Sequence, residues 1–251
     1  MEFVADAPTL LLLFGAALLA GFVDAIAGGG GLITVPALLL AGVSPIAAIG
    51  TNKSQSVFGS GVASATVIRK KIISIDEVRA PFVRAVLGSA VGALIVQRVD
   101  PEALDVVIPI VVAGIGSYFL FAPRVGDVAT EPRIRASIYR NTVVPIIGFY
   151  DGFFGPGTGS FFAMGGVALR GLGVIKATAT AKTLNFGSNV AALAIFVIGG
   201  QVVWAATAAM IAGQLVGATV GARTMISGGT RLIRPLVVTV SIAMLVKWFL
   251  A

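Results

Sequence analysis

The stretch GFVDAIAGGGG, residues 21–31, places a carboxylate and four consecutive glycines directly after a long apolar run. The run itself, PTLLLLFGAALLA at 8–20, has threonine as its one polar side chain. Such a run is typical of a helix in a membrane, where a charge is costly and a glycine cluster interrupts the helix. Asp24 and the break that follows it therefore need a structural or chemical reason.

The composition predicts an integral membrane protein built of helices. Of the 251 residues, 57% are hydrophobic and 12% are charged, and the mean hydropathy is +1.00. A soluble domain carries about 25% charged residues, and a spanning backbone must satisfy its hydrogen bonds within its own segment. A membrane β-barrel would show alternating strands of about ten residues, which these apolar runs do not. The start of the chain lacks the basic region of a signal peptide, so we expect 8–27 to be retained.

Several classes of function are excluded by composition. The chain has no cysteine and no histidine, which removes disulfides, zinc sites and Ser-His or Cys-His catalysis. No cofactor, metal ligand or catalytic residue is predicted, and we expect the protein not to be an enzyme. The net charge of +7 does not indicate a nucleic-acid partner, because the basic residues are scattered over short loops.

Apolar runs between helix breakers divide the chain into ten predicted helical segments. They span 8–27, 31–41, 44–68, 78–97, 102–122, 136–154, 158–169, 174–198, 201–223 and 231–250. Eight are long enough to cross a hydrocarbon core of about 30 Å, which takes about 20 residues. The second and the seventh are too short, and we expect them to be half-helices that end inside the protein.

The basic residues predict the orientation. Four alternate loops, together with the segment ends beside them, contain 14 of the 18 lysines and arginines: Arg69, Lys70, Lys71, Arg79, Arg84, Arg124, Arg133, Arg135, Arg140, Arg170, Lys176, Arg223, Arg231 and Arg234. The positive-inside rule makes these loops cytoplasmic and both termini periplasmic. Segments one and two must then enter and return to the same face, and segments six and seven must do so from the opposite face.

The second half of the sequence repeats the first. GFVDAIAGGGGLITVP at 21–36 aligns with GFYDGFFGPGTGSFF at 148–162, and GTNKSQS at 50–56 aligns with ATAKTLNF at 179–186. Since the halves start on opposite sides, we predict one transmembrane domain over 1–251 with two inverted repeats, at about 8–122 and 136–250. Broken helices at matching positions near the midplane are the sequence mark of a transporter's binding site.

These paired glycine-rich motifs resemble the sulfite exporter TauE/SafE family of membrane permeases over essentially the whole chain. The resemblance implies transport of sulfite, a sulfonate or a related sulfur-containing organic anion across the bacterial inner membrane. One departure is that Pro156, Thr158 and Ser160 interrupt the second glycine run. If the glycines bind substrate, the two halves contribute differently.

Four charges remain once the charges of the loops and of the adjoining segment ends are assigned, one acid and one base in each repeat, and we expect them to lie within the membrane: Asp24, Lys53, Asp151 and Lys182. Each costs at least about 2.5–3.5 kcal/mol at the bilayer centre without a partner or water. One interpretation is a set of structural ion pairs that hold the broken helices. The other is that the lysines face the substrate path while the aspartates act as counter-charges or carry protons.

Polar faces and helix ends complete the predicted site. Lys53, Ser56 and Ser60 share one helix face, as do Lys182, Asn185 and Asn189. The half-helix N-termini offer unpaired N–H groups and partial positive charge to an anion. The predicted substrate-binding residues are Gly28, Gly29, Gly30, Gly31, Asn52, Lys53, Ser56, Gly155, Gly157, Thr158, Gly159, Lys182, Asn185 and Asn189. Close helix packing is the alternative role of the glycines.

The sequence thus predicts an all-α secondary transporter that moves a small anion by alternating access. Its partners would be the anion, the lipid bilayer and protons as a coupling ion. An anion channel on the same scaffold is one alternative. An intramembrane aspartyl protease is another, although the chain lacks a GxGD motif and such a dyad needs carboxylates about 3 Å apart.

Overall fold

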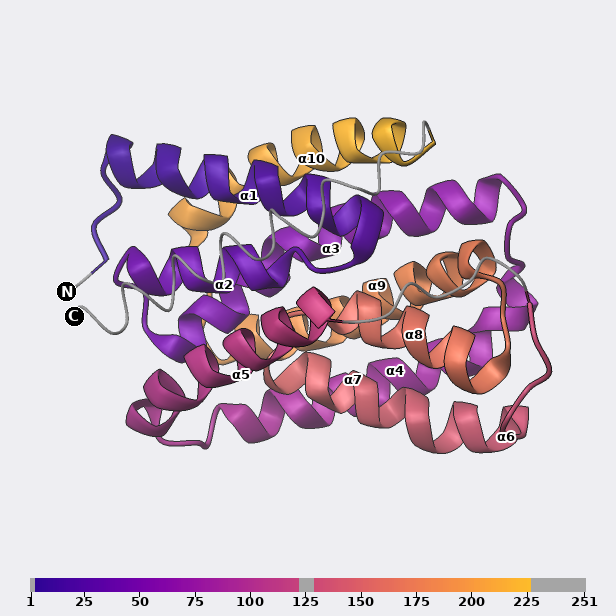
Figure 1. Cartoon of the computed structure of the whole chain (residues 1–251). Helices are drawn as coiled ribbons and strands as arrows, with labels where there is room; N and C mark the ends of the chain where they lie inside the picture. The colour runs from indigo at the N-terminus through magenta and orange to yellow at the C-terminus, as the bar shows by residue number, and fades with distance from the viewer. Residues whose placement is uncertain (1–2, 122–128, 227–251) are drawn as a thin grey trace.

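The computed structural model describes residues 3–121 and 129–226, and all regular structure within them is helical (Figure 1). The helices are α1 (Ala7–Ala27), α2 (Gly31–Leu40), α3 (Pro45–Arg69), α4 (Ile75–Val96), α5 (Pro101–Phe121), α6 (Ala136–Ile138), the π-helical turn η1 (Tyr139–Val143), α7 (Val144–Phe153), α8 (Thr158–Arg170), α9 (Val174–Ile198) and α10 (Trp204–Ile226). The predicted all-α fold is confirmed. The tenth predicted segment, 231–250, lies outside the described residues.

Local sequence explains where the helices begin. Asp6 caps α1 by accepting a hydrogen bond from the N–H of Thr9 at 2.9 Å, and hydrogen bonding by the side chain and then the backbone of Thr9 lowers the pKa of the Asp6 carboxyl. Ser74 and Glu77 form a capping box at the start of α4. This box starts α4 three residues before the predicted boundary at 78.

Four described helices are both long and apolar enough to cross a membrane: Ala7–Ala25, Ile75–Val96, Val174–Ile198 and Trp204–Gly221. They are four of the eight segments predicted to span. Helix α3 has the same length as α9, but the polar residues at its centre lower its hydropathy. Thr51–Gln55 are buried on every side, so this stretch of α3 meets protein rather than lipid.

The two half-helices α2 and α8 fold back along the helices that precede them. Phe3, at the start of the described chain, packs against the apolar cluster that contains Leu38 near the end of α2 and Val43 just after it. At the other hairpin, the N–H of Thr130 bonds to the carbonyl of Gly171 at 2.9 Å, so α8 ends beside the segment that leads into α6. Each hairpin therefore returns to the end of the molecule at which it begins (Figure 1).

Helices of the first half pack against helices of the second half. Helix α1 packs against α10, α4 packs against α7, and α3 lies beside α9. The contact of α4 with α7 is a close glycine seam: a Cβ on Gly92 would lie 2.9 Å from the N of Phe153, and one on Gly152 would lie 2.9 Å from the N of Ala93. Reciprocal contacts of this kind are expected of two copies related by a twofold axis. The inverted repeat stays a prediction.

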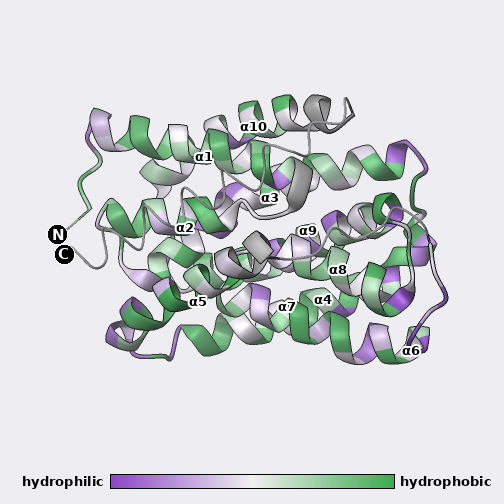
Figure 2. Cartoon of the chain, viewed as in Figure 1, coloured by the Kyte–Doolittle hydropathy of each residue, from purple (hydrophilic) through white to green (hydrophobic). Residues whose placement is uncertain are grey.

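The outer faces of the long helices are apolar, and hydrophilic residues gather at turns and in the interior (Figure 2). Exposed large side chains include Leu11, Leu12, Val91 and Ile198. Exposing so much apolar surface to water would be unfavourable in free energy, whereas contact of this surface with lipid is not. The arrangement suits a multi-pass membrane protein whose polar chemistry lies inside.

Candidate substrate site

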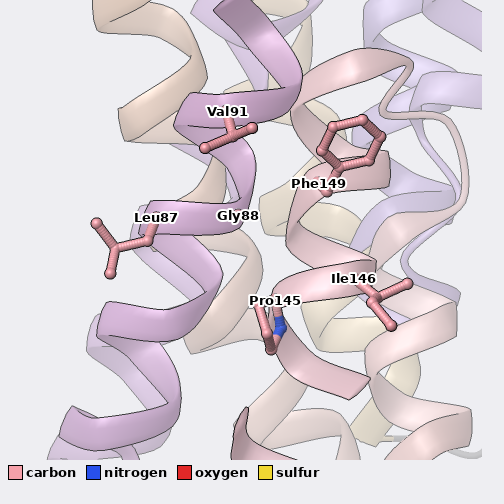
Figure 3. A pocket seen from close by; sticks show the side chains of 6 residues that line it. All are labelled: Leu87, Gly88, Val91, Pro145, Ile146 and Phe149. Atoms are coloured by element: carbon pink, nitrogen blue, oxygen red, sulfur yellow. The ribbon is translucent and has the colours of Figure 1, made fainter. Parts of the chain in front are cut away.

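A shallow apolar groove of about 420 Å³ lies between α4 and α7 on the outside of the molecule (Figure 3). Its lining residues are Leu87, Gly88, Val91, Pro145, Ile146 and Phe149. None carries a polar side chain, so the groove offers nothing to orient a small polar substrate.

The helix breaks lie deeper and are shaped by glycines in the left-handed conformation. Helix α1 ends at Gly28, whose φ is 78°, and α8 begins after Gly157, whose φ is 80°. Gly155, between α7 and α8, has a φ of 94°. Residues with a Cβ rarely adopt this conformation. The half-helices α2 and α8 start with no side-chain cap, as an anion site at their N-termini would require.

The two breaks touch each other. A Cβ on Gly28 would lie 2.8 Å from the carbonyl carbon of Gly159, and a Cβ on Gly31 would lie 3.0 Å from the Cα of Pro156. Backbone therefore packs on backbone at the point where the halves meet. This contact leaves no space for a side chain at Gly28 or Gly31.

A small polar cavity lies at this meeting point. Its lining comes from both halves and consists of Asp24, Gly28, Gly31, Asn52, Ser56, Asp151, Gly155, Gly157, Gly159, Asn185 and Asn189. All of these belong to the set singled out from the sequence. About 20 Å³ is open to the centre of a water-sized sphere, which is room for one water molecule. The described conformation is therefore closed to anything larger.

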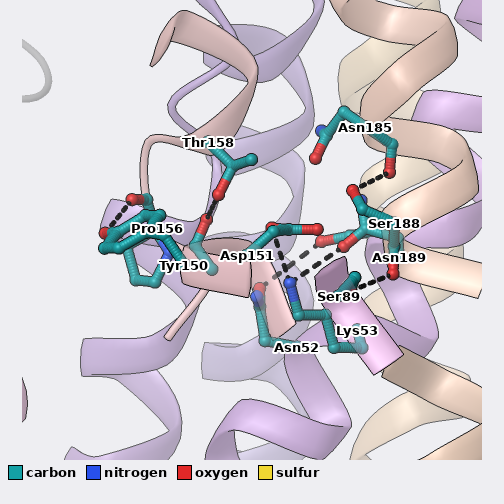
Figure 4. A network of polar contacts seen from close by, with 12 residues as sticks. Asn52, Lys53, Ser89, Tyr150, Asp151, Pro156, Thr158, Asn185, Ser188 and Asn189 are labelled. Carbon is teal, nitrogen blue, oxygen red and sulfur yellow. Dashed lines mark hydrogen bonds and ion pairs between the residues drawn. The ribbon is translucent and has the colours of Figure 1, made fainter. Parts of the chain in front are cut away.

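Lys53 and Asp151 form the most deeply buried polar contact beside this cavity (Figure 4). The Lys53 Nζ donates to Asp151 Oδ1 at 2.7 Å and to Asn189 Oδ1 at 3.2 Å. The side chains are 0% and 1% exposed. The pair joins α3 in the first half to α7 in the second.

Lys182 and Asp24 form the equivalent pair in the opposite sense. The Lys182 Nζ lies 3.2 Å from Asp24 Oδ2 and also donates to the backbone carbonyl of Asp24. These side chains are 5% and 14% exposed, so this pair is less sealed than the first. Each half thus supplies the lysine for the other half's aspartate.

The crossed pairs decide the electrostatics of the cavity. Both aspartates line it, while the two lysines lie behind them, outside the lining. An isolated buried charge costs several kcal/mol, and pairing offsets this cost without leaving a net charge. Two buried oxygens of lining residues, Asp151 Oδ2 and Asn185 Oδ1, have no hydrogen-bond partner among the described residues.

Further side chains hold the second break in place. The hydroxyl of Tyr150 donates to the carbonyl of Pro156 at 2.6 Å, and that of Thr158 donates to the carbonyl of Gly155 at 2.8 Å (Figure 4). On the first break, Thr34 donates to Asn52 Oδ1 at 2.5 Å. Tyr150 and Thr34 are not among the residues predicted from the sequence, although each stands close to one that is.

Three further predicted residues, Gly29, Gly30 and Thr158, pack beside the cavity without lining it. A Cβ on Gly30 would lie 2.9 Å from the carbonyl oxygen of Ala20, and one on Gly29 would lie 3.6 Å from Leu32. Thr158 supports the loop rather than lining the cavity. The structure therefore brings the predicted site together around one cavity, with these two glycines, Thr158 and both lysines just outside its lining.

The chain is similar to a family of membrane proteins along most of its length. The model of the family described as "Sulfite exporter TauE/SafE" matches residues 13–248. The chain belongs to this family. It is 45% identical over 238 residues to "Probable membrane transporter protein ORF9" of a Sinorhizobium species, covering 95% of this chain and 91% of that protein. No solved structure matches it.

Two further relatives are also named as probable membrane transporters. "Probable membrane transporter protein YfcA" of Escherichia coli is 45% identical over 241 residues, covering 96% of this chain and 90% of the relative. "Probable membrane transporter protein" of Haemophilus influenzae is 43% identical over 238 residues, covering 95% and 93%. The protein is therefore a multi-pass membrane transporter of the TauE/SafE family, as the sequence motifs predict, and acts on a small molecule.

Proposed function

We propose that this protein is a secondary transporter of a small anion and that the cavity between the helix breaks is its central site. The substrate class suggested by the family is sulfite, a sulfonate or a related sulfur-containing organic anion. The protein would work in the bacterial inner membrane with both termini on the periplasmic side, as its charge asymmetry predicts.

The observation that carries this proposal is the polar cavity where the two breaks touch. It is lined from both halves, lies at the start of two half-helices without side-chain caps, and has an ammonium group behind each of its carboxylates. Helix N-termini and lysines attract anions. Interrupted helices at matching positions are where inverted-repeat transporters bind their substrates.

The paired aspartates imply that anion binding is linked to protons. In the closed conformation each carboxylate is paired with the lysine ammonium group that an anion would bind. A carboxylate beside a bound anion would also repel it. Protonation of Asp24 or Asp151 removes this competitor and frees the ammonium group. A proton and an anion would then enter the cavity together.

Alternating access follows from the closed geometry. The cavity must widen before an anion can enter, so the contact of Gly28 with Gly159 must open. The two ion pairs already differ in exposure, with Lys182–Asp24 the more accessible. In the opposite conformation we expect this difference to reverse. The alternative of an aspartyl protease finds no support, because each aspartate pairs with a lysine of the other half rather than with the second aspartate.

The test is sulfite binding and uptake by the purified protein in proteoliposomes across a pH series. Wild-type binding should tighten as pH falls, because binding takes up a proton. Asp24→Asn and Asp151→Asn should bind sulfite at neutral pH as tightly as wild type does at low pH, with a weakened pH dependence. Lys53→Gln and Lys182→Gln should lose binding at least tenfold.

Two results would contradict the proposal. One is unchanged pH dependence in both aspartate variants, which removes proton coupling. The other is full binding in both lysine variants, which removes the cavity as the anion site. Flux that does not saturate and appears as unitary conductance would instead indicate a channel.

A further inference from the structure

A second binding surface lies on the outside of the molecule, where the apolar groove between α4 and α7 ends in two arginines. Arg84 on α4 and Arg140 on η1 both donate from Nε to the same acceptor, Asn141 Oδ1, at 3.2 and 3.4 Å. Both side chains are exposed. Two guanidinium groups are thus held around one amide oxygen, at the junction of the two halves.

Local structure explains how they converge. Pro145 has no N–H to donate to the carbonyl of Asn141, and its ring would clash with that carbonyl in a regular α-helix. The chain widens into the π-helical turn Tyr139–Val143 just before it, a feature that often marks functional sites. This turn carries Arg140 and Asn141 at the end of α7 that faces Arg84.

Within 3–121 and 129–226, no carboxylate pairs with the cluster of Arg84, Arg140 and Asn141. Among the residues that the structure describes, neither arginine forms an ion pair. Two like charges close together repel each other, and an anion placed between their free N–H groups would relieve this repulsion. Arginine forks suit the oxygens of a phosphate particularly well.

The groove continues directly from this cluster. Leu87, Gly88 and Val91 follow Arg84 at spacings of three, four and seven, so all four lie on one face of α4. From Arg84 to Val91 the helix rises about 10 Å. Pro145 and Phe149 form the facing wall (Figure 3). Basic at one end and wholly apolar beyond it, this surface matches the two parts of a phospholipid.

We propose that an anionic phospholipid binds here, with its phosphate on Arg84 and Arg140 and an acyl chain along the groove. Both arginines are among the basic residues that the positive-inside rule places toward the cytoplasm, and anionic lipids face the cytoplasm. The occupant is a lipid rather than a free anion, because the apolar groove begins one helical turn beyond the cluster on both helices. The proposal is independent of the substrate that the central cavity takes.

Native mass spectrometry and thermal unfolding of the full-length protein in detergent test this proposal. The probes are phosphatidylglycerol, phosphatidylcholine with the same acyl chains, and inorganic phosphate. We expect phosphatidylglycerol to bind at least tenfold more tightly than phosphatidylcholine, and phosphate alone to give no stabilisation. Arg84→Gln combined with Arg140→Gln should weaken phosphatidylglycerol binding roughly thirtyfold, at the strength typical of two basic residues near a lipid surface.

Matched variants separate the site from general effects. Arg98→Gln removes an exposed arginine elsewhere on the molecule and should leave lipid preference unchanged. Arg84→Lys with Arg140→Lys should restore part of the preference. Leu87→Ala, at a half-exposed groove position, should weaken binding of both lipids. Equal binding of the two lipids, stabilisation by phosphate alone, an unaffected Leu87→Ala variant, or an Arg98→Gln effect equal to that of the double variant would each overturn the proposal.

Discussion

At the scale of single residues, Gly155 is the position where backbone and ion pair meet. Its φ is 94°, and a Cβ built there would lie 2.7 Å from the Nζ of Lys53. Only a residue without a side chain allows the break between α7 and α8 to approach the ammonium group so closely. Gly155 therefore allows the left-handed turn and also leaves room for the Lys53 ammonium group beside Asp151.

Gly155→Ala should lower stability and transport together. The left-handed backbone alone should cost about 1–2 kcal/mol, and the new methyl group should push the Lys53 ammonium away from Asp151. Thermal unfolding in detergent and proteoliposome flux measure the two effects. Gly15→Ala is the control, since nothing lies within 4 Å of a Cβ there, and it should leave both unchanged or slightly improved. Equal behaviour of the two variants would refute the assigned role of Gly155.

Every residue that lines the cavity could be predicted from the sequence, because polar residues in membrane segments are rare and repeat between the halves. Asp24, Asp151 and the glycine runs stand out for this reason. The sequence does not tell that Lys53 pairs with Asp151 rather than with Asp24 of its own repeat. That choice depends on the long-range packing of α3 against α7 and α9, which has no local signal.

At the scale of elements, glycine spacing controls how closely helices approach. Gly88 and Gly92 on α4 face α7, and Gly148 and Gly152 on α7 face α4, each pair four residues apart. Small residues at this spacing let two helix backbones touch in a membrane. The spacing is visible in the sequence, but the partner of each helix is visible only in the fold.

Gly92→Ala should loosen the seam between α4 and α7. Its Cβ would lie 2.9 Å from the N of Phe153 and closer still to the carbonyl of Phe149, and both atoms belong to rigid backbone. Overpacking of this kind typically costs about 1–3 kcal/mol, which a lower thermal midpoint would report. Gly114→Ala on α5, where nothing lies within 4 Å, should cost nothing. A midpoint for Gly92→Ala at or above wild type would contradict the seam.

At the scale of the whole molecule, the crossed ion pairs tie the two halves together. Lys53→Gln alone leaves the buried Asp151 carboxylate unpaired, which should cost about 3–5 kcal/mol. Lys53→Gln with Asp151→Asn should cost much less than the sum of the two single variants. A double-mutant cycle on the thermal unfolding of the four proteins measures this coupling.

The exposed pair of Lys176 and Glu77 is the internal control for that cycle. Its atoms lie 3.0 Å apart, but the side chains are 47% and 50% exposed. Water screens such a pair, so its coupling should stay below about 1 kcal/mol. Similar coupling for the buried and exposed pairs would mean that the crossed contacts do not hold the halves together.

The crossed pairing also has a consequence for synthesis of the chain. Lys53 and Asp151 are 98 residues apart, and Asp24 and Lys182 are 158 apart. At about 5–20 residues per second, the ribosome needs roughly 5–20 s to deliver the partner of Lys53 and longer for that of Asp24. During this interval the first half carries unmatched charges that lipid does not accept cheaply. In the nascent N-terminal half, Asp24 and Lys53 must therefore stay hydrated, or be shielded by the insertion machinery, until the second half has been synthesised and pairs with them.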